Sequence, residues 1–198
     1  MTDLVIVDTG CANISSVYCA FQRLGYEALI SNETSIIQGA SRVVVPGVGS
    51  AGQAMRNIRQ LELVDTLQQL QQPVLGICLG MQMLTSHSME GDVACLSLIP
   101  GEVVPLQADG LRLPHMGWNT LHSIQAHPLL KQFGPEDYVY FVHSFGVAPN
   151  EYSLAQCNYG TDFSAVIGKG NVAGAQFHPE RSGKVGARLL QNFMEWKP

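Results

Sequence analysis

The stretch GICLG places Cys78 between two glycines, Gly76 and Gly80, where a short apolar run changes into a helical pattern. This G-x-C-x-G spacing is the thiol counterpart of the strand-to-helix elbow that presents a nucleophilic serine. Glycines avoid collisions in so sharp a turn, and the N-terminus of the following helix favours a thiolate. The pattern predicts that Cys78 is a nucleophile, with a buried core cysteine beside two loop glycines as the alternative.

A nucleophilic cysteine needs a base, and histidine is the usual one. Among six histidines, His178 stands out because Pro179 restricts it to extended backbone. In an extended chain His178 and Glu180 point to the same side, roughly 6.6 Å apart, so the carboxylate can hold one ring nitrogen while the other faces a thiol. We therefore predict a triad of Cys78, His178 and Glu180. The alternative for the H-x-E pattern taken alone is a structural histidine with its hydrogen bonds met inside the fold, next to a solvent-exposed glutamate.

Attack on a carbonyl also requires N–H donors for the developing oxyanion. The N–H of Leu79, directly after the nucleophile, is the first donor that we expect. The glycine-rich stretch PGVGS, which contains Gly47 and Val48, is expected to supply the second. An ordinary glycine turn is the alternative there.

The scaffold that positions these residues is read from hydrophobic periodicity. Apolar runs alternate with stretches of helical spacing, which predicts an α/β fold in three layers, with an open, mostly parallel central sheet and helices on both faces. Reactive groups collect at the carboxyl ends of such strands. The expected strands of the first half cover 3–8, 27–31, 41–46 and 73–77, and the expected helices cover 13–26 and 51–70. The third strand should end at Pro46, because proline cannot donate to a central ladder.

From about residue 101 the chain changes to short strands with polar connections, including a hairpin turn at 168–171, and it closes with a helix over 183–196. We therefore expect antiparallel strands added to the sheet in the second half. A chain of 198 residues can bury one full core, so residues 1–198 should form a single domain.

Composition excludes several classes of protein. With 46% hydrophobic and 14% charged residues the chain is globular, and its net charge of −5 argues against nucleic acid as a partner. No apolar run approaches the ~20 residues of a membrane span, and no basic leader opens the sequence, so we expect no membrane association and a cytoplasmic location. Five cysteines without a C-x-x-C pair suit neither a disulfide framework nor a zinc site, so no metal and no cofactor are expected. Cys19 and Cys157 should be core residues, and Cys11 should pack or line a loop.

The motifs LGICLGMQ, HPERSG and VVPGVGS, in this order and spacing, resemble a class I (triad) glutamine amidotransferase over almost the whole chain. More narrowly, DTGCANISSV, PHMGWN, YFVHSF and AQCNYG are similar to the branch of this family that provides the glutaminase subunit in histidine biosynthesis. The resemblance implies that Cys78 attacks the carboxamide of glutamine and forms a glutamyl thioester. His178, held by Glu180, would pass a proton to the departing ammonia.

The resemblance also implies roles in substrate binding. Gln82 and the backbone around His143 and Ser144 would hold glutamine. The peptide between Gly47 and Val48 would flip to turn the Val48 N–H into the oxyanion hole. We expect this hole to be unformed at rest, since Val48 stands where a more flexible glycine could have been.

Ammonia is mostly protonated at neutral pH, and ammonium is not a nucleophile, so released ammonia needs a shielded path to its acceptor. The chain is too short to hold a second synthase domain as well. The resemblance implies a heterodimer with a cyclase subunit that is folded as a (β/α)8 barrel and that cleaves and cyclises a phosphoribulosyl formimino nucleotide. Asn13, Tyr140 and Arg181 would lie at the shared face, with ordinary surface positions as the alternative. For Met116 and Trp118, interface and core packing stay equally open.

Two other classes of protein remain to be distinguished from a glutamine amidotransferase. A stand-alone cysteine hydrolase or isomerase of similar architecture would share the elbow but leave PGVGS and HPE without a role. A non-enzymatic module with a flavodoxin-like sheet would not need Cys78, so Cys78→Ala would leave its function untouched.

Overall fold

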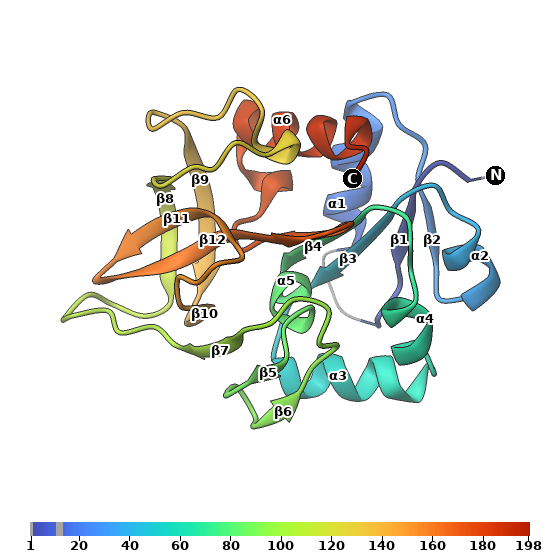
Figure 1. Cartoon of the computed structure of the whole chain (residues 1–198), viewed down its shortest axis with the longest axis horizontal. Helices are drawn as coiled ribbons and strands as arrows, with labels where there is room; N and C mark the ends of the chain where they lie inside the picture. The colour runs from blue at the N-terminus through green and yellow to red at the C-terminus, as the bar shows by residue number, and fades with distance from the viewer. Residues whose placement is uncertain (1, 11–13) are drawn as a thin grey trace.

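A seven-stranded sheet forms the centre of the computed structural model, which describes residues 2–10 and 14–198 (Figure 1). Its spatial order is β11-β12-β13-β4-β3-β1-β2, in which the five strands from β13 to β2 are parallel and β12 and β11 are added by antiparallel pairing. The bounds are β1 (Val5–Val7), β2 (Leu29–Ser31), β3 (Val43–Gly47), β4 (Val74–Cys78), β11 (Ser153–Tyr159), β12 (Thr161–Lys169) and β13 (Val172–Ala175). The antiparallel additions therefore lie in the second half of the chain, as predicted.

Helices cover both faces of this sheet (Figure 1). One face carries α1 (Ile14–Arg23) and α6 (Gly183–Glu195), and the other carries α2 (Thr34–Gln38), α3 (Ala51–Gln60), α4 (Val64–Gln68) and α5 (Leu79–Met83). Because side chains alternate along a strand, β1 and its flank send Leu4 and Ile6 into one core and Val5 and Val7 into the other. The predicted three-layer α/β arrangement is confirmed.

Two smaller sheets stand beside the carboxyl ends of the central strands. One has the order β10-β7-β5-β6, and the other is a ribbon of β8 and β9. Their bounds are β5 (His87–Ser88), β6 (Val93–Ala94), β7 (Glu102–Pro105), β8 (His115–Thr120), β9 (Tyr138–His143) and β10 (Phe145–Val147), and two 3-10 turns, η1 (Pro128–Leu130) and η2 (Pro179–Arg181), complete the elements. These sheets bring Glu90 and residues 142–145 to the end of β4.

Three details differ from the sequence prediction. Strand β3 continues through Pro46 to Gly47, because β1 pairs with β3 only as far as Val44 and leaves that side of Pro46 outside the ladder. The expected helix over 51–70 is two helices, interrupted where Glu62 takes a positive φ of 56°. Cys19 is exposed, because α1 buries Val17, Ala20 and Phe21 on its other side. Cys157 is buried as expected, whereas Cys11 lies outside the described residues.

No helix among residues 2–10 and 14–198 is both long enough and apolar enough to span a membrane.

Candidate active site

Cys78 ends β4 in a backbone conformation that residues other than glycine rarely adopt, with φ 53° and ψ −111°. Both flanking glycines are required by close approaches. A Cβ on Gly76 would lie 2.7 Å from the backbone N of Met81, and one on Gly80 would overlap the carbonyl oxygen of Val45. The predicted sharp turn is therefore confirmed, and it places the thiol at the start of α5.

His178 and Glu180 form a buried ion pair in which Nδ1 of His178 lies 2.8 Å from Oε1 of Glu180. His178 has the extended backbone that Pro179 demands, at φ −95° and ψ 99°. The predicted extended path to Glu180 is wrong, because the residues after His178 form the 3-10 turn η2, which brings the carboxylate back onto the ring. The Ser182 hydroxyl donates to the His178 carbonyl at 2.7 Å, and the His178 N–H donates to the Tyr140 carbonyl at 2.9 Å.

Electrostatics favour a protonated His178. Burial alone would lower its pKa, but hydrogen bonds to Cys78 and Glu180, together with the charges of both, outweigh burial and raise the pKa of His178 to about 10. At neutral pH the ring is therefore an imidazolium that can donate protons toward both the sulfur and the carboxylate.

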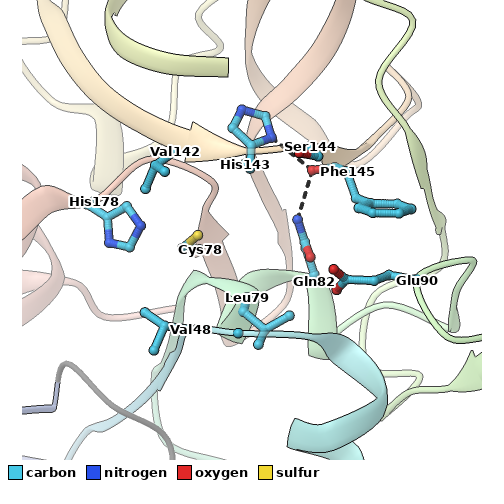
Figure 2. A pocket seen from close by; sticks show the side chains of 11 residues that line it. Val48, Cys78, Leu79, Gln82, Glu90, Val142, His143, Ser144, Phe145 and His178 are labelled. Carbon is cyan, nitrogen blue, oxygen red and sulfur yellow. Dashed lines mark hydrogen bonds between the residues drawn. The ribbon is translucent and has the colours of Figure 1, made fainter. Parts of the chain in front are cut away.

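A pocket of about 220 Å³ opens over the thiol (Figure 2). All but two of the predicted catalytic, oxyanion and substrate residues line it. The full set of lining residues is Val48, Gly49, Cys78, Leu79, Gln82, Glu90, Val142, His143, Ser144, Phe145 and His178. Of the two others, Gly47 pairs with Cys78 across β3 and β4, and Glu180 lies behind His178. The structure thus brings together side chains from β3, β4, α5, β9 and the end of β13.

The amide of Gln82 is held from two sides. Its Nε2 donates to the Phe145 carbonyl at 2.9 Å (Figure 2). The same nitrogen donates to Oε1 of Gln176 at 2.9 Å, which leaves Gln82 Oε1 available to a ligand. The Phe145 carbonyl also accepts from Nδ1 of His143 at 2.8 Å. Gln82, His143 and Gln176 are all buried.

A second histidine completes this polar chain. Nε2 of His143 lies 3.1 Å from Nδ1 of His115, and Nε2 of His115 lies 3.4 Å from the side-chain nitrogen of Asn119. Because a carbonyl only accepts, His143 carries its proton on Nδ1, so its Nε2 accepts from His115. Burial lowers the pKa of His143 to about 3 and that of His115 to about 4, so both rings are neutral.

The predicted interface residues occupy the neighbouring surface. Tyr140 on β9 is half-buried, and Arg181 in η2 is exposed, while Asn13 lies outside the described residues. Met116 and Trp118 on β8 are 62% and 55% exposed, which excludes core packing for both. Trp118 pairs with Tyr140 across the ribbon, with ring centroids 5.9 Å apart.

Sequence reasoning missed three residues of the site. Gln176 had a signal, since it is a polar residue in an otherwise apolar strand two positions before His178. Glu90 lies in a polar loop with no local pattern, and only the fold brings it to the pocket, where its Oε2 accepts from the Ala51 N–H at 2.8 Å. His115 could be placed only through the pairing of β8 with β9. Within the described part of the chain, no three histidine, cysteine or carboxylate side chains are grouped to hold a metal ion.

An elbow cysteine, a histidine–glutamate pair and a small pocket at the carboxyl edge of a parallel sheet define an amide- or ester-cleaving class of cysteine enzyme. Residues 5–196 match the family model described as glutamine amidotransferase class-I. The chain therefore belongs to the class-I glutamine amidotransferases. Solved structures agree on the fold: one titled glutamine amidotransferase has a TM-score of 0.75 at 19% identity, with 96% of this chain and 97% of that chain covered. Another, of a putative GMP synthase protein from Thermoplasma acidophilum, has a TM-score of 0.74 at 18% identity, with 98% and 93% covered.

Curated relatives are similar over their full length. The imidazole glycerol phosphate synthase subunit HisH of Idiomarina loihiensis is 55% identical, over 98% of this chain and 97% of that protein. The protein of the same name from Colwellia psychrerythraea is 52% identical, with 96% and 92% covered. That of Haemophilus influenzae strain 86-028NP is 51% identical, with all of both chains covered. The narrower resemblance read from the sequence motifs is thereby confirmed.

Proposed function

We propose that this chain is the glutaminase subunit of an imidazole glycerol phosphate synthase, which hydrolyses glutamine to glutamate and ammonia. The observation that carries the proposal is the buried Cys78–His178–Glu180 arrangement, in which Cys78 and His178 line a pocket sized for one amino acid. Full-length similarity to proteins named HisH supports the choice within the family.

The chemistry follows from the charges of the triad. The Cys78 thiolate attacks the side-chain carbonyl carbon of glutamine, and the N–H groups of Leu79 and Val48 bind the resulting oxyanion. The His178 imidazolium gives its proton to the departing nitrogen, so that ammonia leaves and a glutamyl thioester remains. His178, now neutral, takes a proton from water, whose oxygen attacks the thioester carbonyl. Glutamate and the Cys78 thiolate are released, and the imidazolium is restored.

Recognition of glutamine rests on polar groups at the far end of the pocket from His178. Gln82 Oε1 accepts from the substrate, and the backbone at His143 and Ser144 binds its main-chain groups. Glu90 supplies the carboxylate that suits an α-ammonium group, since it is the acidic side chain among the pocket-lining residues. We propose this set for substrate binding, with Gly47 and Val48 moving to complete the oxyanion hole when the partner binds.

The partner is a cyclase subunit that uses the ammonia to make imidazole glycerol phosphate and an aminoimidazole carboxamide ribonucleotide. The word subunit in the relatives' names supports a complex. The exposed apolar surface of Met116 and Trp118, beside Tyr140, is the face that we assign to this heterodimer, together with Asn13 and Arg181.

The test is glutamate production from glutamine by this chain, alone and with its cyclase subunit plus the nucleotide ligand. Cys78→Ala is the control. We expect little turnover by the isolated chain, strong stimulation in the complex, and none in the variant. Full activity of the isolated chain would favour the stand-alone cysteine hydrolase and remove the gated oxyanion hole. Activity that survives Cys78→Ala would overturn the mechanism.

A further inference from the structure

The hydrogen-bond chain beside the thiol has one consistent polarity, and a backbone carbonyl fixes it. The Phe145 carbonyl can only accept, so the group of Gln82 that faces it at 2.9 Å is the amide nitrogen. The second N–H of that nitrogen points at Gln176, 2.9 Å away, which must therefore present its oxygen. The nitrogen of Gln176 is then left facing the sulfur of Cys78, at 3.7 Å.

The reverse orientation of Gln176 is excluded by the same contacts. It would place the N–H donors of Gln82 and Gln176 against each other across the 2.9 Å contact. Gln176 is fully buried, so its amide makes both contacts directly with protein groups and does not share them with solvent. Its place follows from the sheet: Ala175 pairs with Ile77 in the parallel ladder of β13 and β4, Cys78 is the last residue of β4, and Gln176 directly follows β13.

We propose that Gln176 is a further catalytic residue, whose side-chain N–H donates to the Cys78 sulfur and stabilises the thiolate. Its Oε1 at the same time holds Gln82 in the orientation that presents Gln82 Oε1 to a ligand. One buried amide thus acts on both the attacking atom and a substrate-binding group. The inference rests on the proposed function only in taking Cys78 as the attacking group.

Other titratable groups around the sulfur come from different elements. His178, with Glu180 behind it, faces the thiol from the end of β13, and His143 lines the pocket from β9 as a neutral ring. Glu90 lines the pocket from the loop between β5 and β6. None of these groups is altered by a substitution at Gln176, so a change in thiol reactivity reports on the amide.

The experiment measures alkylation of Cys78 by iodoacetamide across pH, with the Cys78 peptide quantified by mass spectrometry. Gln176→Met keeps the length of the side chain but removes the N–H donor. We expect alkylation at neutral pH to slow about tenfold, and the pH of half-maximal rate to rise by about one pH unit. Exposed Cys19, labelled in the same sample, is the internal reference, and its rate should stay unchanged.

A second measurement needs no substitution at Gln176, in case the variant does not fold. In wild-type protein labelled with ¹⁵N-glutamine, one side-chain proton of Gln176 should shift with pH at the midpoint of Cys78 alkylation, and this response should disappear in Cys78→Ala. An unchanged alkylation profile in folded Gln176→Met, or a Gln176 amide that ignores the thiol, would overturn the proposal. Neither measurement uses glutamine as a substrate or requires a partner, so failure of the proposed function would be seen separately.

Discussion

Removing the charge of Glu180 while keeping its shape gives the sharpest test of the triad. In Glu180→Gln the side-chain oxygen can still accept from Nδ1 of His178, at the position where the carboxylate lies 2.8 Å away. The tautomer of His178 is therefore kept, and only the negative charge is lost. Because both side chains are buried, solvent screens this charge very little.

The size of the effect follows from the charge state of His178. Despite burial, Cys78 and Glu180 together raise the pKa of His178 from 6.5 to about 10. At about 1.4 kcal/mol for each pKa unit, they favour the imidazolium by on the order of 5 kcal/mol. Glu180 is one of these two partners, so its loss lowers the pKa of His178 and destabilises the imidazolium. About half of this energy corresponds to a turnover slowed about 30- to 100-fold.

The assay is kcat/KM for glutamine against pH, in the complex with the cyclase subunit. Wild type should lose activity on the alkaline side only as His178 deprotonates near pH 10, and the variant should lose it at a lower pH, because its imidazolium has lost the neighbouring negative charge. Glu151→Gln makes the same change at an exposed turn residue and should match wild type. An alkaline limb that does not move in Glu180→Gln would refute the electrostatic reasoning.

Three further outcomes are expected. Burial lowers the pKa of His115 from 6.5 to about 4, so between these pH values the unfolded chain binds a proton that the folded chain does not, and stability present above pH 6.5 is lost as pH falls toward 4. His115→Phe should flatten this loss by about 1.4 kcal/mol per pH unit within that window in urea titrations, and equal slopes would contradict it. Gly80→Ala should destabilise the fold by about 3 kcal/mol, because the new Cβ meets the Val45 carbonyl. Gly52→Ala is the matched control: its Cβ lies 3.5 Å from the flexible Arg56 guanidinium, and the fold should gain about 0.5 kcal/mol of stability in the same assay. Trp118→Ala should leave stability within about 0.5 kcal/mol and weaken cyclase binding about tenfold or more in calorimetry, and unchanged affinity would remove Trp118 from the interface.

The parts of the fold that depend on local pattern could be predicted from the sequence. The four apolar strands of the first half and the elbow at Cys78 are specified by periodicity and by glycine spacing within a few residues of one another. The prediction of where β3 ends failed because it depends on pairing with a strand that is distant in the sequence. Pro46 continues β3 because β1 has already ended its pairing, and no window around Pro46 contains that information.

The same distinction holds for the site. Cys78, His178 and Gln82 carry strong local motifs, and the structure places all three together. The route of Glu180 to His178 through a 3-10 turn was not predictable from strand geometry, although the pair itself was. Glu90 reaches the pocket only because the small sheet folds over α3, and its carboxylate also binds the first N–H of that helix.

The Phe145 carbonyl has both of its lone pairs engaged, one by Gln82 and one by His143. With both lone pairs used, this oxygen accepts no further hydrogen bond from a molecule that enters the pocket, although Phe145 lines the wall. Selectivity at that end then comes from other groups, among them Gln82 Oε1, the Glu90 carboxylate and the backbone at His143 and Ser144. Loss of either donor would create a new acceptor in the wall, so a substitution at His143 would alter which small molecules the pocket retains as well as how firmly it is built.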